Sequence, residues 1–378
     1  MGGLRALADF VPEFDATVVS RLEEAGAVIL GKLNLTEGAM AGYHRDFSIP
    51  VNPWDAEWWP GASSSGSGVA TAAGLCFASL GSDTGGSIRF PSLANGIVGL
   101  KPTYGRVSRY GVLALAESLD HVGPMTRRSA DAALVLEAMA GFDARDTSSL
   151  REPVPDMARE LARGIQGVRI GYDRRYATEG VDRELVAAIE QALNDLERAG
   201  AELCEIELPA FTEELADAWF KICSREACNA HRANYPLKAD QFGGYFRDFL
   251  DMGRTLSDED YDAATRLRTE FSSAFTDVLS AIDALASPAG GMTFKLEREK
   301  QYGRADDFEV LFDAIQVQFT FPADFAGTPA LSLPCGFSRE GLPLTIQFMG
   351  KHLSEAMLCR IGHVYEELTG WYKKHPPL

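Results

Sequence analysis

The chain has 378 residues, 46% of them hydrophobic and 24% charged, which is the composition of a folded globular protein and excludes a disordered chain. The formal net charge of −18 makes nucleic acid or an anionic membrane a poor partner, because both require a concentrated basic face. We find no run of about 18 apolar residues. No apolar leader follows Met1, so we expect a cytoplasmic protein with no membrane segment.

The first predicted elements are a helix and a strand within residues 15–31. Asp15 is placed to cap the helix and Gly26 to end it. The apolar run Ala27–Leu30 then predicts a buried strand.

Residues 61–105 hold 10 glycines and 8 serines but only three charged residues. Apolar segments alternate with these small residues, so we expect short helices and strands joined by tight glycine turns rather than a flexible linker.

The middle of the chain predicts a strand, a helix and a second strand. Ser129 is placed to cap a helix over 130–140. Residues 168–172 then predict a strand, 182–199 a long amphipathic helix, and 202–208 another strand. Such a unit favours parallel pairing of its two strands.

The last part of the chain begins with a charged, mostly helical region over 210–283, followed by a strand ending at Pro288. Residues 331–334 and 344–348 predict closing strands, and 354–369 a terminal helix. In the helical region, aromatic residues are expected on the helix surface and in the core, with some at a substrate entrance: Trp219, Tyr235 and Tyr245.

The six cysteines are scattered without CxxC pairs, which predicts free thiols and neither a zinc site nor a disulfide framework. They are Cys76, Cys204, Cys223, Cys228, Cys335 and Cys359.

Two serine-rich turns, Gly61–Gly68 and Gly81–Arg89, carry candidate nucleophiles. A serine needs a base, and also donors aimed at the developing oxyanion. Thr84, Gly85 and Gly86 stand directly before Ser87, and glycines allow consecutive backbone amides to converge on one point. For either turn alone, a purely structural glycine-rich turn remains the alternative.

Together the two turns, with Ser63 and Ser87 24 positions apart, resemble the amidase signature family, whose hydrolases use a Ser-cis-Ser-Lys triad. Similar motifs cover most of the chain: Gly61–Ser67, Gly81–Pro91, Gly96–Thr103 and Ser118–Met125, with weaker matches at Asp15–Glu37 and Gly327–Gly350.

The resemblance implies one domain over 1–378, an α/β/α sandwich with a central mixed, mostly parallel sheet covered by helices. Its signature core would span about 52–128, its variable helical region about 210–283, and 327–378 would return to the sheet. The family needs no cofactor or metal.

The resemblance also implies residue roles. Ser87 would be the nucleophile and acyl carrier, and the amides of Thr84, Gly85, Gly86 and Ser87 would bind the oxyanion. Ser63 would relay the proton, held by a cis peptide bond after Ala62, where the family usually has glycine.

Three further residues of these turns have expected roles. For Asp83 and Arg89 we favour an ion pair that braces the nucleophile loop, and the alternative is that Arg89 orients a substrate carboxylate. Ser64 is expected either to brace the loop or to contact substrate.

The family's catalytic lysine lies on a strand that would precede Met1, so the segment that carries it is expected to be absent from this chain. Lys32 and Lys101 match other family lysines, for which we expect structural roles. His121 follows Asp120, as in a Ser-His-Asp triad, but the resemblance places that pair in a structural turn. We therefore expect weak amide hydrolysis.

The predicted activity is hydrolysis of a small-molecule carboxamide at its C–N bond through an acyl-Ser87 intermediate. One alternative is the hydrolase subunit of a glutamine-dependent tRNA amidotransferase, which works with partner proteins. Another is a truncated, non-catalytic family member that binds or oligomerises. The sequence leaves open which amide is the substrate and whether the chain forms a homodimer.

Overall fold

A computed structural model describes residues 1–377, with only the backbone of residues 308–310. The described chain forms a sheet of eight strands in the order β1-β3-β2-β7-β8-β6-β4-β5. The strands are β1 (Ala78–Asp83), β2 (Val98–Lys101), β3 (His121–Thr126), β4 (Arg169–Tyr172), β5 (Glu202–Glu205), β6 (Ala284–Pro288), β7 (Ala330–Phe337) and β8 (Pro343–Met349).

The sheet is mixed, but the prediction that it is mostly parallel is wrong. Only the β4–β5 and β4–β6 pairs are parallel, and the other five neighbouring pairs are antiparallel. A parallel pair needs a crossover connection, and the predicted strand–helix–strand unit supplies one between β4 and β5. β7 and β8, by contrast, are joined by a short turn, which produces an antiparallel pair.

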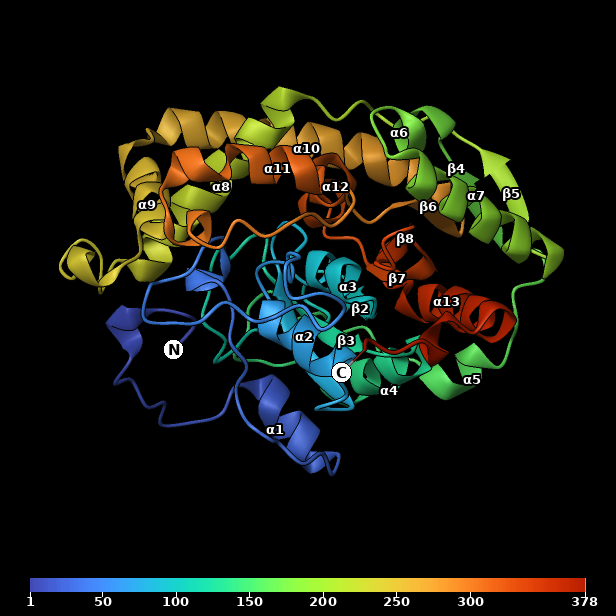
Figure 1. Ribbon diagram of the computed structural model, residues 1–378, viewed down its shortest axis with the longest axis horizontal. Coiled ribbons are helices and arrows are strands. Elements are labelled where there is room, and N and C mark those ends of the chain that lie inside the picture. Colours follow the sequence, from blue (N-terminus) through green and yellow to red (C-terminus); the bar gives the residue numbers. More distant parts are fainter. Residues whose placement is uncertain (378) are drawn as a thin grey trace.

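Helices pack on both faces of the sheet. Figure 1 shows α8, α10, α11 and α12 across the upper part of the molecule and α9 at its left end, with α4, α5 and α13 toward the lower right. The helices are α1 (Thr17–Glu24), α2 (Ser65–Ala72), α3 (Arg89–Asn95), α4 (Ser129–Met139), α5 (Met157–Leu161), α6 (Arg174–Thr178), α7 (Arg183–Arg198), α8 (Glu213–His231), α9 (Gly244–Thr255), α10 (Asp258–Ser280), α11 (Glu309–Ile315), α12 (Phe321–Phe325) and α13 (Glu355–Thr369).

Alternation along the strands divides the interior into two cores. On β6, Leu285 faces a core shared with α8, α9 and α10, while Ala284 and Ala286 face a core shared with α4, α7 and α13. Successive side chains of a strand point to opposite faces of the sheet, so one strand serves both cores. The predicted α/β/α layering is therefore confirmed.

Local capping explains where two of the predicted helices begin. The Asp182 carboxylate accepts the Glu184 amide at 2.7 Å and caps α7. Ser129 is the first residue of α4 rather than its cap, because its amide and hydroxyl both donate to the buried Glu366 carboxylate.

The predicted buried strand at Ala27–Leu30 is wrong. These residues have no strand structure, and Val28 and Leu30 are 82% and 74% exposed. The helix before them is present as α1, but Ala16 rather than Asp15 is its N-cap. An apolar run shows a preference for burial, whereas a strand also requires a neighbour to accept its backbone hydrogen bonds.

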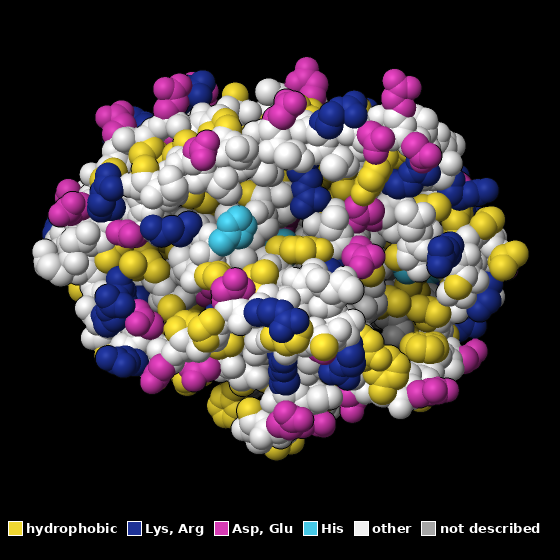
Figure 2. All heavy atoms as spheres, turned by 180° about the vertical axis from the view of Figure 1, so that it is seen from behind, with side chains coloured by type: hydrophobic (Ala, Val, Ile, Leu, Met, Phe, Trp, Pro, Cys, Tyr) yellow, Lys and Arg dark blue, Asp and Glu magenta, His cyan; other side chains and the backbone are white. Residues whose placement is uncertain are grey.

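The surface carries both signs of charge. On the face in Figure 2, basic and acidic side chains are interspersed. Among residues 1–377, no helix combines the length and the apolar composition needed to span a bilayer. All six cysteines are free, three of them buried and three half-buried.

Candidate active site

The loop that holds Ser87 joins β1 to α3 and needs its two glycines. A Cβ on Gly85 would lie 2.6 Å from Cζ2 of Trp219. Gly86 has φ +124°, and a Cβ there would lie 2.4 Å from the Phe90 ring. The loop therefore packs directly against aromatic rings, at a distance that no other residue type permits.

Asp83 organises this loop from inside. Its carboxylate accepts the Gly86 amide at 2.6 Å and the Ile88 amide at 3.0 Å. The prediction that the Gly86 amide is free to bind an oxyanion is therefore wrong, because this amide donates to Asp83 within the loop. Burial opposes ionisation of Asp83, but the Arg89 guanidinium outweighs it and holds the pKa of the Asp83 carboxyl well below its usual range.

Arg89 is completely buried and braces the loop, as favoured from the sequence. It donates to Asp83 through Nε at 3.1 Å and Nη2 at 2.9 Å, and to Asp324 through Nη2 at 2.6 Å. Its Nη1 donates to the Thr320 carbonyl and to Gln347 Oε1. The alternative role, orienting a substrate carboxylate, is wrong because the guanidinium faces protein groups on every side.

Asp324 is a site residue that the sequence did not indicate. It lies on α12, 235 positions from Arg89, and no motif surrounds it. Burial raises the pKa of Asp324 well above its usual value. Only the tertiary structure brings this carboxyl behind the nucleophile loop.

Lys101 is buried near the same carboxylates and has the structural position expected of it. Its Nζ donates to the Pro102 carbonyl at 3.1 Å. Burial lowers the pKa of Lys101 to about 8. Lys101 does not line the pocket that contains Ser87.

Asp120 and His121 also belong to the scaffold, as predicted. Asp120 accepts the Leu115 and Ala116 amides and the Thr84 hydroxyl, the last at 2.6 Å. His121 Nδ1 donates to the Asp83 carbonyl at 3.1 Å. The Asp120 carboxyl therefore fixes Thr84 in the loop that holds Ser87. Neither Asp120 nor His121 lines the Ser87 pocket.

The remaining predicted oxyanion donors lie at the pocket. Thr84, Gly85 and Ser87 all line it, and their amides have no hydrogen-bond acceptor among the described residues. Ser87 itself is half-buried. Amides of this kind, beside a reachable hydroxyl, are the groups that stabilise a tetrahedral oxyanion.

The second serine turn lies against the first. The predicted cis peptide bond between Ala62 and Ser63 is present, and the Ser64 amide donates to the Ser87 carbonyl at 3.3 Å. Ser63 is buried, but its Oγ has no hydrogen-bond partner among the described residues.

The hydrogen bond from Ser63 to Ser87 that a proton relay implies is therefore not formed in this structure. The position of a serine hydroxyl depends on one rotatable bond, and no described partner holds the Ser63 hydroxyl toward Ser87. Catalytic hydrogen bonds often tighten only when substrate is bound.

Ser64 braces the two turns. Its Oγ accepts the Ser82 amide at 3.2 Å and lies 3.3 Å from the Ser82 carbonyl. It does not line the Ser87 pocket, so loop bracing is the role that its contacts support.

The Ser87 pocket is small and apolar, with a cavity volume of about 40 Å³. Its lining comes from the nucleophile loop, α3, α8, α11, α12 and the connecting loops. The lining residues are Ala39, Met40, Ala41, Trp59, Ala62, Thr84, Gly85, Ser87, Phe90, Leu115, Trp219, Leu311, Phe312, Ile315 and Phe321. Trp219, noted in the sequence as a residue of the helical region, is thus part of the site.

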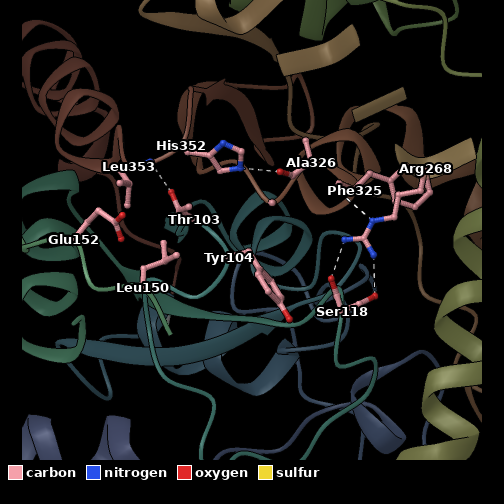
Figure 3. A pocket seen from close by; sticks show the side chains of 11 residues that line it. Thr103, Tyr104, Ser118, Leu150, Glu152, Arg268, Phe325, Ala326, His352 and Leu353 are labelled. Carbon is pink, nitrogen blue, oxygen red and sulfur yellow. Dashed lines mark hydrogen bonds between the residues drawn. The ribbon is translucent and has the colours of Figure 1, made fainter. Parts of the chain in front are cut away.

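A larger cavity of about 540 Å³ lies elsewhere and contains neither Ser63 nor Ser87. Figure 3 shows Glu152 and Arg268 on opposite sides of it, with Tyr104 between them and His352 above. Arg268 donates to the Ser118 hydroxyl and to the carbonyls of Ser118 and Phe325. This cavity has charged walls but no nucleophile within a glycine turn.

No group of three or more His, Cys, Asp or Glu side chains within the described part of the chain is arranged to hold a metal ion.

A serine in a glycine turn, a cis-linked second serine and a mixed sheet between helices together define the class. The chain belongs to the amidase family, whose model, described as amidase, matches residues 1–359.

The chain is also similar to individual proteins of this family. The Mycobacterium tuberculosis protein named as the amidase AmiD is 43% identical over 376 residues, covering 100% of this chain and 78% of the relative. A glutamyl-tRNA(Gln) amidotransferase subunit from Myxococcus xanthus is 40% identical over 402 residues, covering 100% of this chain and 81% of the relative. The solved peptide amidase of Stenotrophomonas maltophilia has a TM-score of 0.80 and 32% identity, covering 96% of this chain and 78% of that chain.

Proposed function

We propose that this chain hydrolyses a carboxamide at its C–N bond, with Ser87 as the nucleophile. The observation that carries the proposal is that Ser87 lines one pocket together with Thr84 and Gly85, and that the amides of these three residues have no hydrogen-bond acceptor among the described residues. The membership of the amidase family supports the same reaction.

In the first half of the reaction, a bond forms between Ser87 Oγ and the amide carbon, while the carbonyl oxygen takes negative charge beside the loop amides. The C–N bond then breaks, and the proton that leaves Ser87 ends on the departing nitrogen. Water attacks the acyl-serine in the second half, which releases the carboxylic acid and returns the proton to Ser87. Ammonia or an amine and one acid are formed for each water consumed.

Ser63 is the proposed carrier of the proton between Ser87 and a base. None of the side chains that line the described pocket is a lysine, histidine or carboxylate. A serine hydroxyl with no adjacent base is a weak nucleophile. We therefore expect slow turnover of amides, and faster acylation by reagents whose leaving group departs without a proton.

The test is labelling by a fluorophosphonate, with mass spectrometry to locate the adduct. Ser87 should carry the label, Ser87→Ala should abolish it, and Ser63→Ala should slow it by at least about tenfold. Labelling of a different residue, or unchanged labelling of the Ser87→Ala variant, would exclude Ser87 as the nucleophile and favour a non-catalytic role.

A second candidate is the hydrolase subunit of a glutamine-dependent amidotransferase, supported by the 40% identity to the Myxococcus xanthus protein. Glutaminase activity that is present only with co-purified partner proteins would support it. A single domain over 1–378 and a cytoplasmic location remain predictions from the sequence, which leaves open whether the chain forms a homodimer.

A further inference from the structure

The walls of the Ser87 pocket contain no charged side chain. Apart from Thr84 and Ser87, all the lining side chains are hydrophobic, or are glycine, which has none. Three aromatic residues from separate helices, Phe90, Trp219 and Phe321, stand around the nucleophile loop.

The polar groups near the pocket that might recognise a charged substrate are already occupied. The Thr84 hydroxyl donates to Asp120 at 2.6 Å, and the Trp219 indole donates to the Thr84 carbonyl at 2.9 Å. Behind the loop, Arg89 is completely buried and is held by the carboxylate of Asp83 and the carboxyl group of Asp324. Among the side chains of the described lining residues, the Ser87 hydroxyl alone is left for the substrate, and together with the loop amides it would contact the reacting carboxamide itself.

The apolar wall stands directly beside those reacting groups. Trp219 and Phe321 are stacked with ring centroids 4.2 Å apart, and both would contact a Cβ added at Gly85. A group attached to the carbonyl carbon at Ser87 therefore meets aromatic surface within one or two bonds.

We infer that the pocket selects carboxamides with an uncharged, apolar acyl group and rejects acyl groups that carry a carboxylate or an ammonium. The inference rests on the proposed function, because it assumes that the acyl group is transferred to Ser87. A charge placed against this wall would lose its hydration and find no partner, which disfavours its binding strongly. Free glutamine carries both charges two methylenes from its carboxamide, so it is a poor substrate for this pocket.

The test compares two acylating esters that have the same leaving group. p-Nitrophenyl propionate delivers a short apolar acyl group suited to a cavity of about 40 Å³, and mono-p-nitrophenyl succinate delivers one that ends in a carboxylate. Rates of Ser87 acylation are measured by mass spectrometry as second-order rate constants, with the remaining ester followed throughout, because the succinyl carboxylate accelerates the hydrolysis of its own ester. We expect the propionyl ester to react about 100-fold faster on this scale.

The outcomes separate the inference from the function on which it rests. Equal rates for the two esters, or a faster succinyl ester, would overturn the selectivity while leaving Ser87 as the nucleophile. Acylation of Ser87 by neither ester would overturn the proposed function, and the selectivity with it.

A charge placed in the wall gives an independent check. Phe312 lines the pocket from α11 and is half-buried, so a longer polar side chain can reach solvent there. Phe312→Arg should raise the succinyl-to-propionyl rate ratio about tenfold relative to Phe312→Met, which removes the ring without adding charge. An identical ratio in the two variants would mean that charge at the wall does not determine selectivity, and would contradict the inference.

Discussion

Two cavities among the described residues differ in volume and in the charge of their walls: the larger cavity is charged and the smaller one is uncharged. The cavity between Arg268, Glu152 and His352 measures about 540 Å³ and has charged walls, whereas the Ser87 pocket measures about 40 Å³ and has none. The five-residue helix α12 separates them, since its Phe321 lines the Ser87 pocket and its Phe325 lines the larger cavity.

The charges near Ser87 lie behind the loop rather than in the pocket. Arg89, Asp83 and Asp324 are fully buried and bonded to one another, so they position the backbone without meeting a substrate. Arg268 instead is half-buried and donates only to neutral oxygens. Cavity volume alone would therefore favour the larger cavity, whereas the unpaired loop amides favour the Ser87 pocket as the proposed site.

The largest expected effect tests whether the buried Arg89 contributes more to stability than the half-buried Arg268. Arg89→Met leaves Asp83 and Asp324 buried without their cation, and we expect a loss of about 3–5 kcal/mol in the free energy of unfolding. Arg268→Met removes hydrogen bonds to neutral acceptors and should cost about 1–2 kcal/mol. Urea titration followed by circular dichroism measures both.

Arg89→Lys gives a folded comparison if the methionine variant is insoluble, because it keeps the charge but loses the forked contacts. Equal losses for Arg89→Met and Arg268→Met would contradict the distinction between the two regions.

A smaller effect is expected from crowding the apolar pocket. Gly85→Ala places a methyl group 2.6 Å from the Trp219 ring, and we expect a loss of about 1–3 kcal/mol together with slower fluorophosphonate labelling of Ser87. Gly336→Ala is the control, since its Cβ would meet Ala188 at an ordinary 3.5 Å. Labelling of Gly85→Ala at the wild-type rate would show that the loop and rings are less closely packed than described.

A third prediction concerns pH and the loop that forms one wall of the pocket. Glu37 is 1% exposed, and only its Oε2 has a partner, the Gly243 amide. Burial raises the pKa of Glu37 to about 8. The folded state therefore holds this proton more tightly than the unfolded state, so its contribution to stability is complete below about pH 4.5 and is lost as the pH rises to about 8.

Glu37→Gln imitates the protonated acid. Its melting temperature should match the wild type at pH 4 and exceed it at pH 8.5, as measured by differential scanning fluorimetry across that range. Parallel curves for the two proteins would mean that Glu37 does not titrate in this interval.

The smallest effect is expected in the larger cavity. His352 is exposed and shares one hydrogen bond with the Ala326 carbonyl. His352→Ala should change the free energy of unfolding by no more than about 0.5 kcal/mol and leave Ser87 labelling unchanged. A tenfold change in labelling would show that the two cavities communicate across α12.

Predictions from the sequence agree with the structure where a feature depends on neighbouring residues, and they fail where it depends on distant contacts. The helix α7 is indicated by the residues of its own segment, and the cis bond at Ala62–Ser63 is implied by the family resemblance of a local motif; both are present. Ala27–Leu30 was predicted as a strand from its apolar character, but it is exposed because no described strand pairs with it. The amide of Gly86 was predicted to face a substrate, whereas the carboxylate three residues earlier accepts it.

The sequence by itself indicated the two glycine–serine turns, because glycine readily adopts the positive φ angles that tight turns require, as at Gly61 and Gly86. It also determined the pairing of Asp83 with Arg89, the only two charged residues between positions 61 and 100. Tertiary structure alone decided that Asp324 completes that pairing and that Trp219 and Phe321 form the wall beside Ser87. Those residues come from helices more than 100 positions away in the chain, and nothing in a local pattern specifies which distant surfaces will pack together.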